Sequence, residues 1–188
     1  MPDTAILLIA FGPFRARPVN GSATVARALH DQRIAGCRLI SAVLPVCWGE
    51  PERRLPQLLT EHRPELLLGL GEGQPGAMRF ETRAYNRSAG EDTTGQLPVS
   101  NRLDRQGPTQ CPSRLDFDPG WFDQTRLGFI RSDDAGEYLC NSLLYTGLRL
   151  MSGPCGFVHL PPQLTTPDRN YLATGIVDHL QVLIERNR

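Results

Sequence analysis

The residues of this chain best suited to nucleophilic chemistry are a glutamate, a cysteine and a histidine that lie far apart in the sequence. Glu81 occurs in RFETRAY, Cys140 in AGEYLCN and His159 in GFVHLP. A cysteine thiolate beside a histidine base can attack a carbonyl carbon when a carboxylate orients the histidine. Each of the three also has an ordinary structural interpretation, so the surrounding sequence has to be weighed.

Cys140 belongs to one apolar face of an expected helix, together with Leu143 and Leu148. A buried structural cysteine would occupy the same face, because free cysteines are among the most buried residues. However, Asp134 and Glu137 have the spacing of a capping box, and a helix N-terminus stabilises a thiolate. Since Cys140 falls in the first or second helical turn, both interpretations stay open.

His159 ends the expected strand GFVH, directly before LPP. Strand ends are where α/β proteins place their functional sites, although a histidine there can also satisfy a loop carbonyl. Glu81 lies within the strand-like row MRFETRAYN, where a carboxylate needs a partner if it is buried. His30, His62 and His179 fall on expected helices, and we assign them no chemistry.

The glycine run GLGEGQPG at residues 69–76 is similar to a phosphate-binding loop. Its spacing differs from the dinucleotide fingerprint, and it precedes a strand-like segment instead of opening a helix. We interpret it as a tight strand exit whose glycines allow close backbone approach. Nucleoside binding is an alternative that this run alone supports.

Apolar runs and amphipathic stretches alternate along the chain and must position these residues. Strands are expected at 5–10, 39–44, 65–70, 78–86, 127–130 and 155–160. Helices are expected at 22–30 behind a Ser22 cap, at 53–62, around Cys140 and from Asp168. This order predicts an α/β layered fold with a largely parallel sheet. Residues 87–119 are expected to be loops around the mouth of the site.

The overall composition narrows the class of protein. The 188 residues, 40% of them hydrophobic, suffice for one substantial core, so we expect one domain over residues 1–188. A net charge of zero gives no reason to expect nucleic acid or an anionic membrane as partner. All 20 basic residues are arginine, which excludes a pyridoxal phosphate Schiff base and a Walker lysine.

The cysteines and the N-terminal segment indicate the compartment. Five cysteines without close paired spacing favour reduced thiols over a zinc site or a disulfide framework. The apolar run AILLIAF is too short to span a bilayer and has no basic flank. We therefore expect an unprocessed cytoplasmic protein.

Five segments in chain order resemble pyroglutamyl peptidase I, the pyrrolidone-carboxylate peptidases of peptidase family C15. AFGPF with NGS resembles the family's GFxPF and NPS, and LPV resembles the end of its second strand. GLGEG with ETRAYN resembles its glycine turn and ERxAxN, while AGEYLCN and GFVHLP resemble AGTYVCN and GFIHVP. This resemblance spans most of the chain and puts Glu81, Cys140 and His159 on the catalytic positions.

The resemblance implies a three-layer α/β/α sandwich of the phosphorylase/hydrolase-like kind, with a central mixed, largely parallel sheet. It implies a cysteine peptidase that uses no metal or organic cofactor and assembles as a homotetramer. The substrate would be a peptide with a blocked N-terminus, from which a pyroglutamyl residue is removed. By analogy, the substrate-binding residues are Phe11, Phe14, Asn20, Val46, Gly71, Glu72, Tyr138 and Leu139.

Two departures from the family pattern keep an alternative open. After Asn86 the family usually carries Asp-Ala-Arg-Ile-Pro-Asp-Asn, whereas this chain has RSAGEDTTGQLP. Glu72 stands where the family usually has glutamine, which would put a carboxylate near a site for a neutral ring. The alternative is a paralogue that hydrolyses another small amide or N-acyl group, or that only binds a small ligand.

Overall fold

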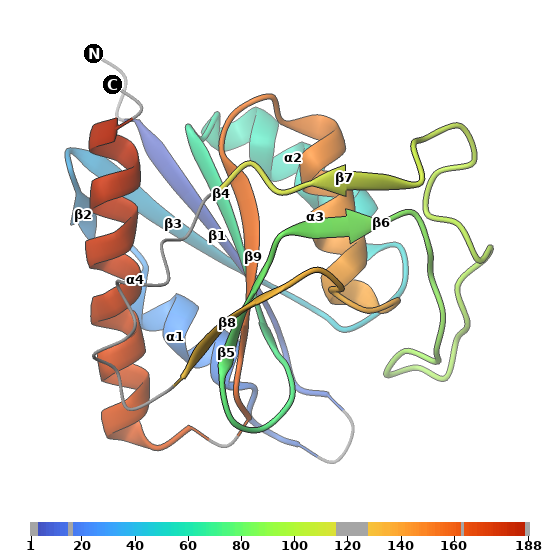
Figure 1. Cartoon of the computed structure of the whole chain (residues 1–188), viewed down its shortest axis with the longest axis horizontal. Coiled ribbons are helices and arrows are strands. Elements are labelled where there is room, and N and C mark those ends of the chain that lie inside the picture. Colours follow the sequence, from blue (N-terminus) through green and yellow to red (C-terminus); the bar gives the residue numbers. More distant parts are fainter. Residues whose placement is uncertain (1–3, 15–16, 116–127, 163, 187–188) are drawn as a thin grey trace.

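A seven-stranded sheet forms the centre of the protein, in the order β2-β3-β1-β4-β9-β5-β8 (Figure 1). The computed structural model describes residues 4–14, 17–115, 128–162 and 164–186. The strands of this sheet are β1 (Ala5–Phe11), β2 (Arg33–Ile34), β3 (Cys37–Leu44), β4 (Leu66–Glu72), β5 (Met78–Glu81), β8 (Phe129–Ser132) and β9 (Cys155–Leu160). Neighbours β3, β1, β4 and β9 are parallel, whereas β5 pairs antiparallel with β9. The expected mixed, largely parallel sheet is confirmed.

Helices cover both faces of this sheet, which gives three α/β/α layers (Figure 1). The helices are α1 (Gly21–Leu29), α2 (Glu50–His62), α3 (Leu139–Leu150) and α4 (Thr166–Arg186). Helices α1 and α4 pack on one face, and α2 and α3 pack on the other. Side chains of β1 alternate between the two cores, so Leu8 belongs to the first and Ile9 to the second. A strand covered on both faces is apolar throughout, as the run AILLIA predicted.

The row at residues 78–86 is not the single strand that its alternating pattern predicted. β5 ends at Glu81, and β6 (Arg83–Tyr85) pairs with β7 (Gln110–Pro112) in a separate two-stranded sheet. The chain changes partner at Thr82, whose N–H still bonds to the main sheet while its carbonyl bonds to the β7 side. Residues 87–119 are therefore not loop throughout, and their last four lie outside the described residues, as does residue 127 of the expected strand 127–130.

The helix caps also differ from expectation. Asn20, and not Ser22, caps α1, because Asn20 Oδ1 accepts a hydrogen bond from the Ser22 N–H at 3.0 Å. Helix α3 begins directly after Tyr138, so Asp134 lies too far upstream to cap it. This later start places Cys140 in the first turn of the helix.

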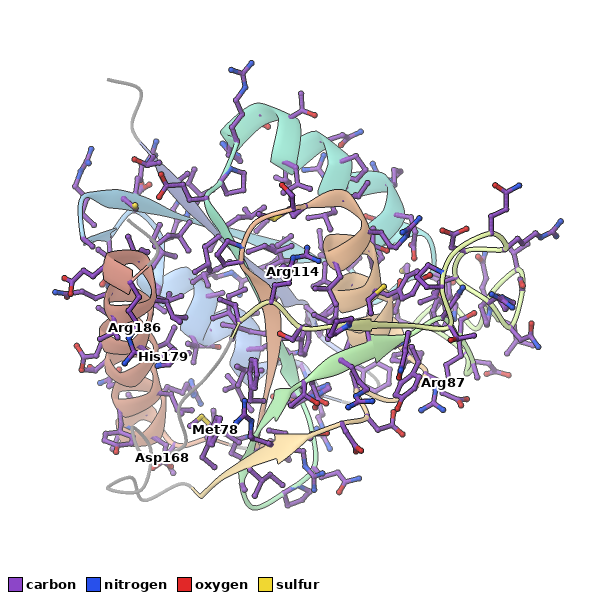
Figure 2. The ribbon with its side chains drawn as sticks, turned by 45° about the horizontal axis from the view of Figure 1, so that its top comes forward. Met78, Arg87, Arg114, Asp168, His179 and Arg186 are labelled. Atoms are coloured by element: carbon purple, nitrogen blue, oxygen red, sulfur yellow. The ribbon has the colours of Figure 1, made fainter. Side chains whose placement is uncertain are left out.

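Arg114 fixes the end of α3 that lies away from Cys140 (Figure 2). Its guanidinium donates hydrogen bonds to the carbonyls of Leu148, Met151 and Gly153 at 3.1, 2.5 and 3.0 Å. A cation at this position satisfies carbonyls left free at a helix C-terminus and is favoured by the helix dipole. Within the described part of the chain, no helix is both long and apolar enough to cross a membrane.

Candidate active site

Glu81 and His159 form a buried hydrogen-bonded pair at the end of β5. Glu81 Oε1 lies 2.8 Å from His159 Nδ1, and the two side chains are 1% and 11% exposed. A carboxylate so deeply buried needs a donor, which the imidazole supplies. Because Nδ1 contacts the carboxylate, Nε2 is the ring nitrogen left for a second partner.

The second partner of this imidazole is Cys140, which hydrogen-bonds to His159 from the first turn of α3. Burial lowers the pKa of His159, but the charge and hydrogen bond of Cys140, followed by those of Glu81, outweigh it and raise the pKa to about 10. The histidine is then an imidazolium at neutral pH, and its positive charge favours an anionic partner. The structure thus brings the three predicted catalytic residues together.

The end of strand β4 and the residue that follows it make room for the sulfur and the imidazole, because glycine stands where each of them packs. A Cβ on Gly71 would lie 2.8 Å from Cys140 Sγ, and one on Gly73 would lie 2.8 Å from His159 Cβ. Real Cβ atoms do not approach other atoms so closely without a shift of the structure. The glycine run therefore serves close packing and leads into β5, as the strand-exit interpretation requires.

Asn141 anchors the first turn of α3 to β6. Its Oδ1 accepts from the Tyr85 N–H at 2.8 Å, and its Nδ2 donates to the carbonyls of Tyr85 and Arg87 at 2.8 and 3.0 Å. The asparagine is fully buried. These three bonds fix the position of its neighbour Cys140, and sequence reasoning missed the role of Asn141 because its partners lie over 50 residues away.

Arg87 holds the loop that leads into α3 (Figure 2). Its guanidinium lies 4.6 Å from the Tyr85 ring centroid and pairs with Asp134 at 2.5 Å and Glu137 at 3.4 Å. The two acidic residues expected to form a capping box are thus partners of Arg87. Arg87 is the first residue of the segment that departs from the family pattern. This segment therefore helps to position the candidate nucleophile Cys140.

A cavity of about 190 Å³ opens beside Cys140. Its lining consists of Phe11, Phe14, Arg17, Asn20, Val46, Glu72, Gly73, Tyr138, Leu139 and Cys140. Seven of the eight predicted substrate-binding residues are in this lining. Gly71 is outside it, because the side from which a Cβ would project is filled by the sulfur and by Phe157. A separate cavity of about 370 Å³ beside Trp48 contains none of the predicted catalytic residues.

Apolar and polar residues have different roles in this cavity. The rings of Phe14 and Tyr138 lie 5.4 Å apart, and Trp48 packs edge-on against Tyr138. Asn20 mainly holds the backbone, since its Nδ2 donates to the Gly12 carbonyl at 3.0 Å while its Oδ1 caps α1. The wall therefore combines aromatic surface with a rigid polar support.

Both carboxylate oxygens of Glu72 are engaged. Oε1 accepts from the Gly21 N–H at 2.6 Å, and Oε2 lies 3.1 Å from Arg17 Nη1. Sequence reasoning expected a carboxylate here but missed Arg17, which lies 55 residues away. The sequence offered one signal for this pairing: a carboxylate in a buried place, as Glu72 would be, needs a partner that offsets its charge.

A cysteine beside an imidazole that a buried carboxylate orients, at the edge of a small aromatic-walled cavity, places the protein among the cysteine hydrolases. The sequence profile described as pyroglutamyl peptidase matches residues 4–177. The chain therefore belongs to the pyroglutamyl peptidase family, the cysteine peptidases of family C15.

Named relatives support this membership. Human pyroglutamyl-peptidase 1 is 30% identical over 168 residues, which cover 86% of this chain and 80% of the human protein. The pyrrolidone-carboxylate peptidase of Mycobacterium marinum is 30% identical over 182 residues, covering 89% and 82% of the two chains.

Solved structures share the fold. Pyrrolidone carboxyl peptidase from Thermococcus litoralis has a TM-score of 0.85 at 21% identity, over 98% of this chain and 96% of that one. Pyroglutamyl peptidase I from Bacillus amyloliquefaciens has a TM-score of 0.83 at 20% identity, over 95% and 96%. At these identities the likeness supports the α/β/α fold and no finer statement.

Proposed function

We propose that this protein removes an N-terminal pyroglutamyl residue from peptides through a thioester on Cys140. The observation that carries the proposal is the imidazole of His159, which contacts Glu81 through Nδ1 and also hydrogen-bonds to Cys140. The Cys140 thiolate attacks the carbonyl carbon that joins pyroglutamate to the next residue, and the carbonyl electrons move to oxygen. Backbone N–H groups in the first turn of α3, that of Cys140 included, face this oxyanion.

Collapse of this tetrahedral species breaks the C–N bond. The imidazolium of His159 gives its proton to the leaving amine, so a neutral amino terminus departs and a thioester remains on Cys140. His159 then takes a proton from water, which attacks the thioester and releases pyroglutamate with the thiolate restored. Throughout, Glu81 holds the imidazole in one orientation and stabilises its charge.

The cavity supports a small acyl group as the substrate. Its volume of about 190 Å³ is below the range of drug-sized pockets and suits a five-membered lactam. Phe11, Phe14 and Tyr138 offer apolar walls to the ring, while the peptide continues outward from Cys140. A blocked N-terminus suits such a site because it carries no ammonium to desolvate.

We also propose one domain over residues 1–188, a cytoplasmic location and a homo-oligomer, specifically a homotetramer. All five cysteines are free, which suits a reducing compartment.

Leu97 and Val99 are 65% and 101% exposed, and such apolar surface supports contact between copies. Light scattering coupled to size-exclusion chromatography measures the assembly directly, and a monomer at micromolar concentration would contradict it.

The alternative paralogue with changed acyl specificity is favoured by one observation, the carboxylate of Glu72 in the cavity wall. Its pairing with Arg17 weakens that argument, because the charge is balanced within the protein. A non-catalytic paralogue has less support, since the Glu81–His159 pair and the Cys140 contact have no evident structural purpose beyond mutual orientation.

A fluorogenic pyroglutamyl amide tests the proposal. We expect the native protein to release the fluorophore, and we expect Cys140→Ala and prior iodoacetamide treatment to abolish release. Cys47→Ala is the matched control, because Cys47 is the other cysteine that is not buried. Absence of turnover in the folded native protein, or full activity in Cys140→Ala, would contradict the proposed function.

A further inference from the structure

The cavity beside Cys140 holds a carboxylate although the proposed substrate ring is neutral. Glu72 lines this cavity with its side chain only 10% exposed. A carboxylate in such a place is unfavourable unless a cation or several donors offset its charge. An uncompensated charge would also repel the carbonyl oxygen of a lactam, so the partner of Glu72 decides what the cavity accepts.

Arg17 is held where it can supply the opposite charge. Its Nη1 lies 3.1 Å from Glu72 Oε2, and its side chain, half exposed, also lines the cavity. The Arg17 N–H donates to the Phe14 carbonyl at 3.1 Å, which ties the backbone of the arginine to that of an aromatic wall residue. Arg17 and Phe14 both line the cavity, so the cation and the aromatic ring belong to the same wall.

Helix α1 provides the second compensating group. The Gly21 N–H, the first of the helix, donates to Glu72 Oε1 at 2.6 Å, while Asn20 caps the Ser22 N–H. The positive end of the helix dipole thus faces the same carboxylate as Arg17 does. With both oxygens engaged, Glu72 presents no free charge to the cavity.

We propose that Arg17 is a specificity-determining positioning residue, which cancels the charge of Glu72 and so makes the wall of the cavity neutral toward the lactam ring. This inference rests on the proposed function, and it explains how a cavity for a neutral ring can contain a glutamate. Arg17 acts through Glu72 and not on the reacting atoms. Its loss should weaken substrate binding and leave the chemistry at Cys140 unchanged.

The test compares steady-state kinetics of four proteins on a pyroglutamyl amide. In Arg17→Met we expect KM to rise on the order of fivefold, the scale of a half-exposed ion pair, with kcat within about twofold. In Arg17→Met/Glu72→Gln the lone charge is gone, and KM should return to within about twofold of the native value. The glutamine keeps an oxygen for the Gly21 N–H, and melting temperatures confirm that each variant is folded.

Arg53→Met is the matched control. Arg53 pairs with Glu50 at 2.7 Å with side-chain exposures of 57% and 17%, similar to the 50% and 10% of Arg17 and Glu72, but neither residue lines the cavity. This variant should leave KM and kcat as they are in the native protein. A rise in the KM of Arg53→Met would show that loss of an ion pair outside the cavity also raises KM. That result would overturn the inference.

The outcomes separate this inference from the proposed function, which is judged on the native protein alone. If the native protein turns over the amide but Arg17→Met has an unchanged KM, the inference is wrong. An equal rise in KM in the single and double variants would mean that Arg17 contacts the substrate itself, which also contradicts it. If the native protein is inactive, an NMR titration with uncharged 2-pyrrolidone compares the same proteins, and equal affinities or no binding overturn the inference.

Discussion

Glu81 and His159 lie on strands that run in opposite directions, and their side chains meet at 2.8 Å across those strands. The register pairs Glu81 with Phe157, and Arg79 with His159, so the contact is diagonal. The reversal of β5 relative to β9 therefore sets the geometry of the pair. A shift of this register by one residue would turn Glu81 away from the imidazole.

The Glu81–His159 pair predicts an alkaline limit to activity. The pKa of His159 is about 10, so the imidazolium that protonates the leaving amine is lost as pH rises through that value. In Glu81→Gln one of the charges that raise this pKa is absent, and the decline in kcat/KM should begin at lower pH. A pH–rate profile of both proteins checks this, and coincident alkaline limbs would contradict the role of Glu81.

The same raised pKa predicts that stability depends on pH. The pKa of His159 in the folded protein lies above the ordinary value of 6.5, so the folded state binds the proton more tightly. The resulting stabilisation is complete below about pH 6.5 and is lost progressively as pH rises to about 10. Urea unfolding should show a larger deficit for His159→Gln at low pH than at high pH. A deficit of the same size at low and at high pH would contradict the prediction.

Gly71→Ala should raise the activation free energy of catalysis by more than it lowers the free energy of unfolding. The new methyl group would lie 2.8 Å from Cys140 Sγ and displace the sulfur from His159. Misplacement of a reacting atom by about 1 Å lowers kcat on the order of 100-fold. Gly156→Ala, whose methyl would meet Leu115 Cβ at 2.9 Å, is a control with similar crowding away from the sulfur. Equal kcat values in the two variants would contradict this account of β4.

Asn141→Ala should destabilise the protein. The change leaves the partly buried N–H and carbonyl of Tyr85 and the carbonyl of Arg87 without their side-chain partner, at a cost of about 2–3 kcal/mol in the free energy of unfolding. Chemical denaturation measures the loss. Asn101→Ala, at an exposed position, is the control and should stay within about 0.5 kcal/mol of the native protein. A loss in Asn141→Ala no larger than in the control would show that these bonds contribute nothing net.

Much of the fold could be predicted because its signals are local. The run at residues 5–10 is apolar throughout, since both faces of β1 are covered, and such a run indicates a buried strand directly. The passage from β5 to β6 was mispredicted because the residue types in the sequence keep alternating through Thr82. The backbone, however, changes its hydrogen-bond partners at that residue. Sequence patterns report which side chains alternate and not which strand they pair with.

The candidate site could be predicted only in part for a related reason. Glu81, Cys140 and His159 stand in short segments that resemble family motifs, so the sequence indicated three residues that the fold brings together and most of the residues that line the cavity. The partnership of Arg17 with Glu72 depends on how the turn after β1 packs against the end of β4. That packing is a property of the folded chain, and no local pattern encodes it.

Trapping of the acyl-enzyme tests most directly whether Cys140 is the nucleophile. The native protein is mixed with a pyroglutamyl ester, quenched in acid during turnover, digested and analysed by mass spectrometry. The account predicts one pyroglutamyl group on the peptide that contains Cys140 and none on the peptide that contains Cys47. Steady turnover without any thioester on Cys140, or with the acyl group on another residue, would contradict it.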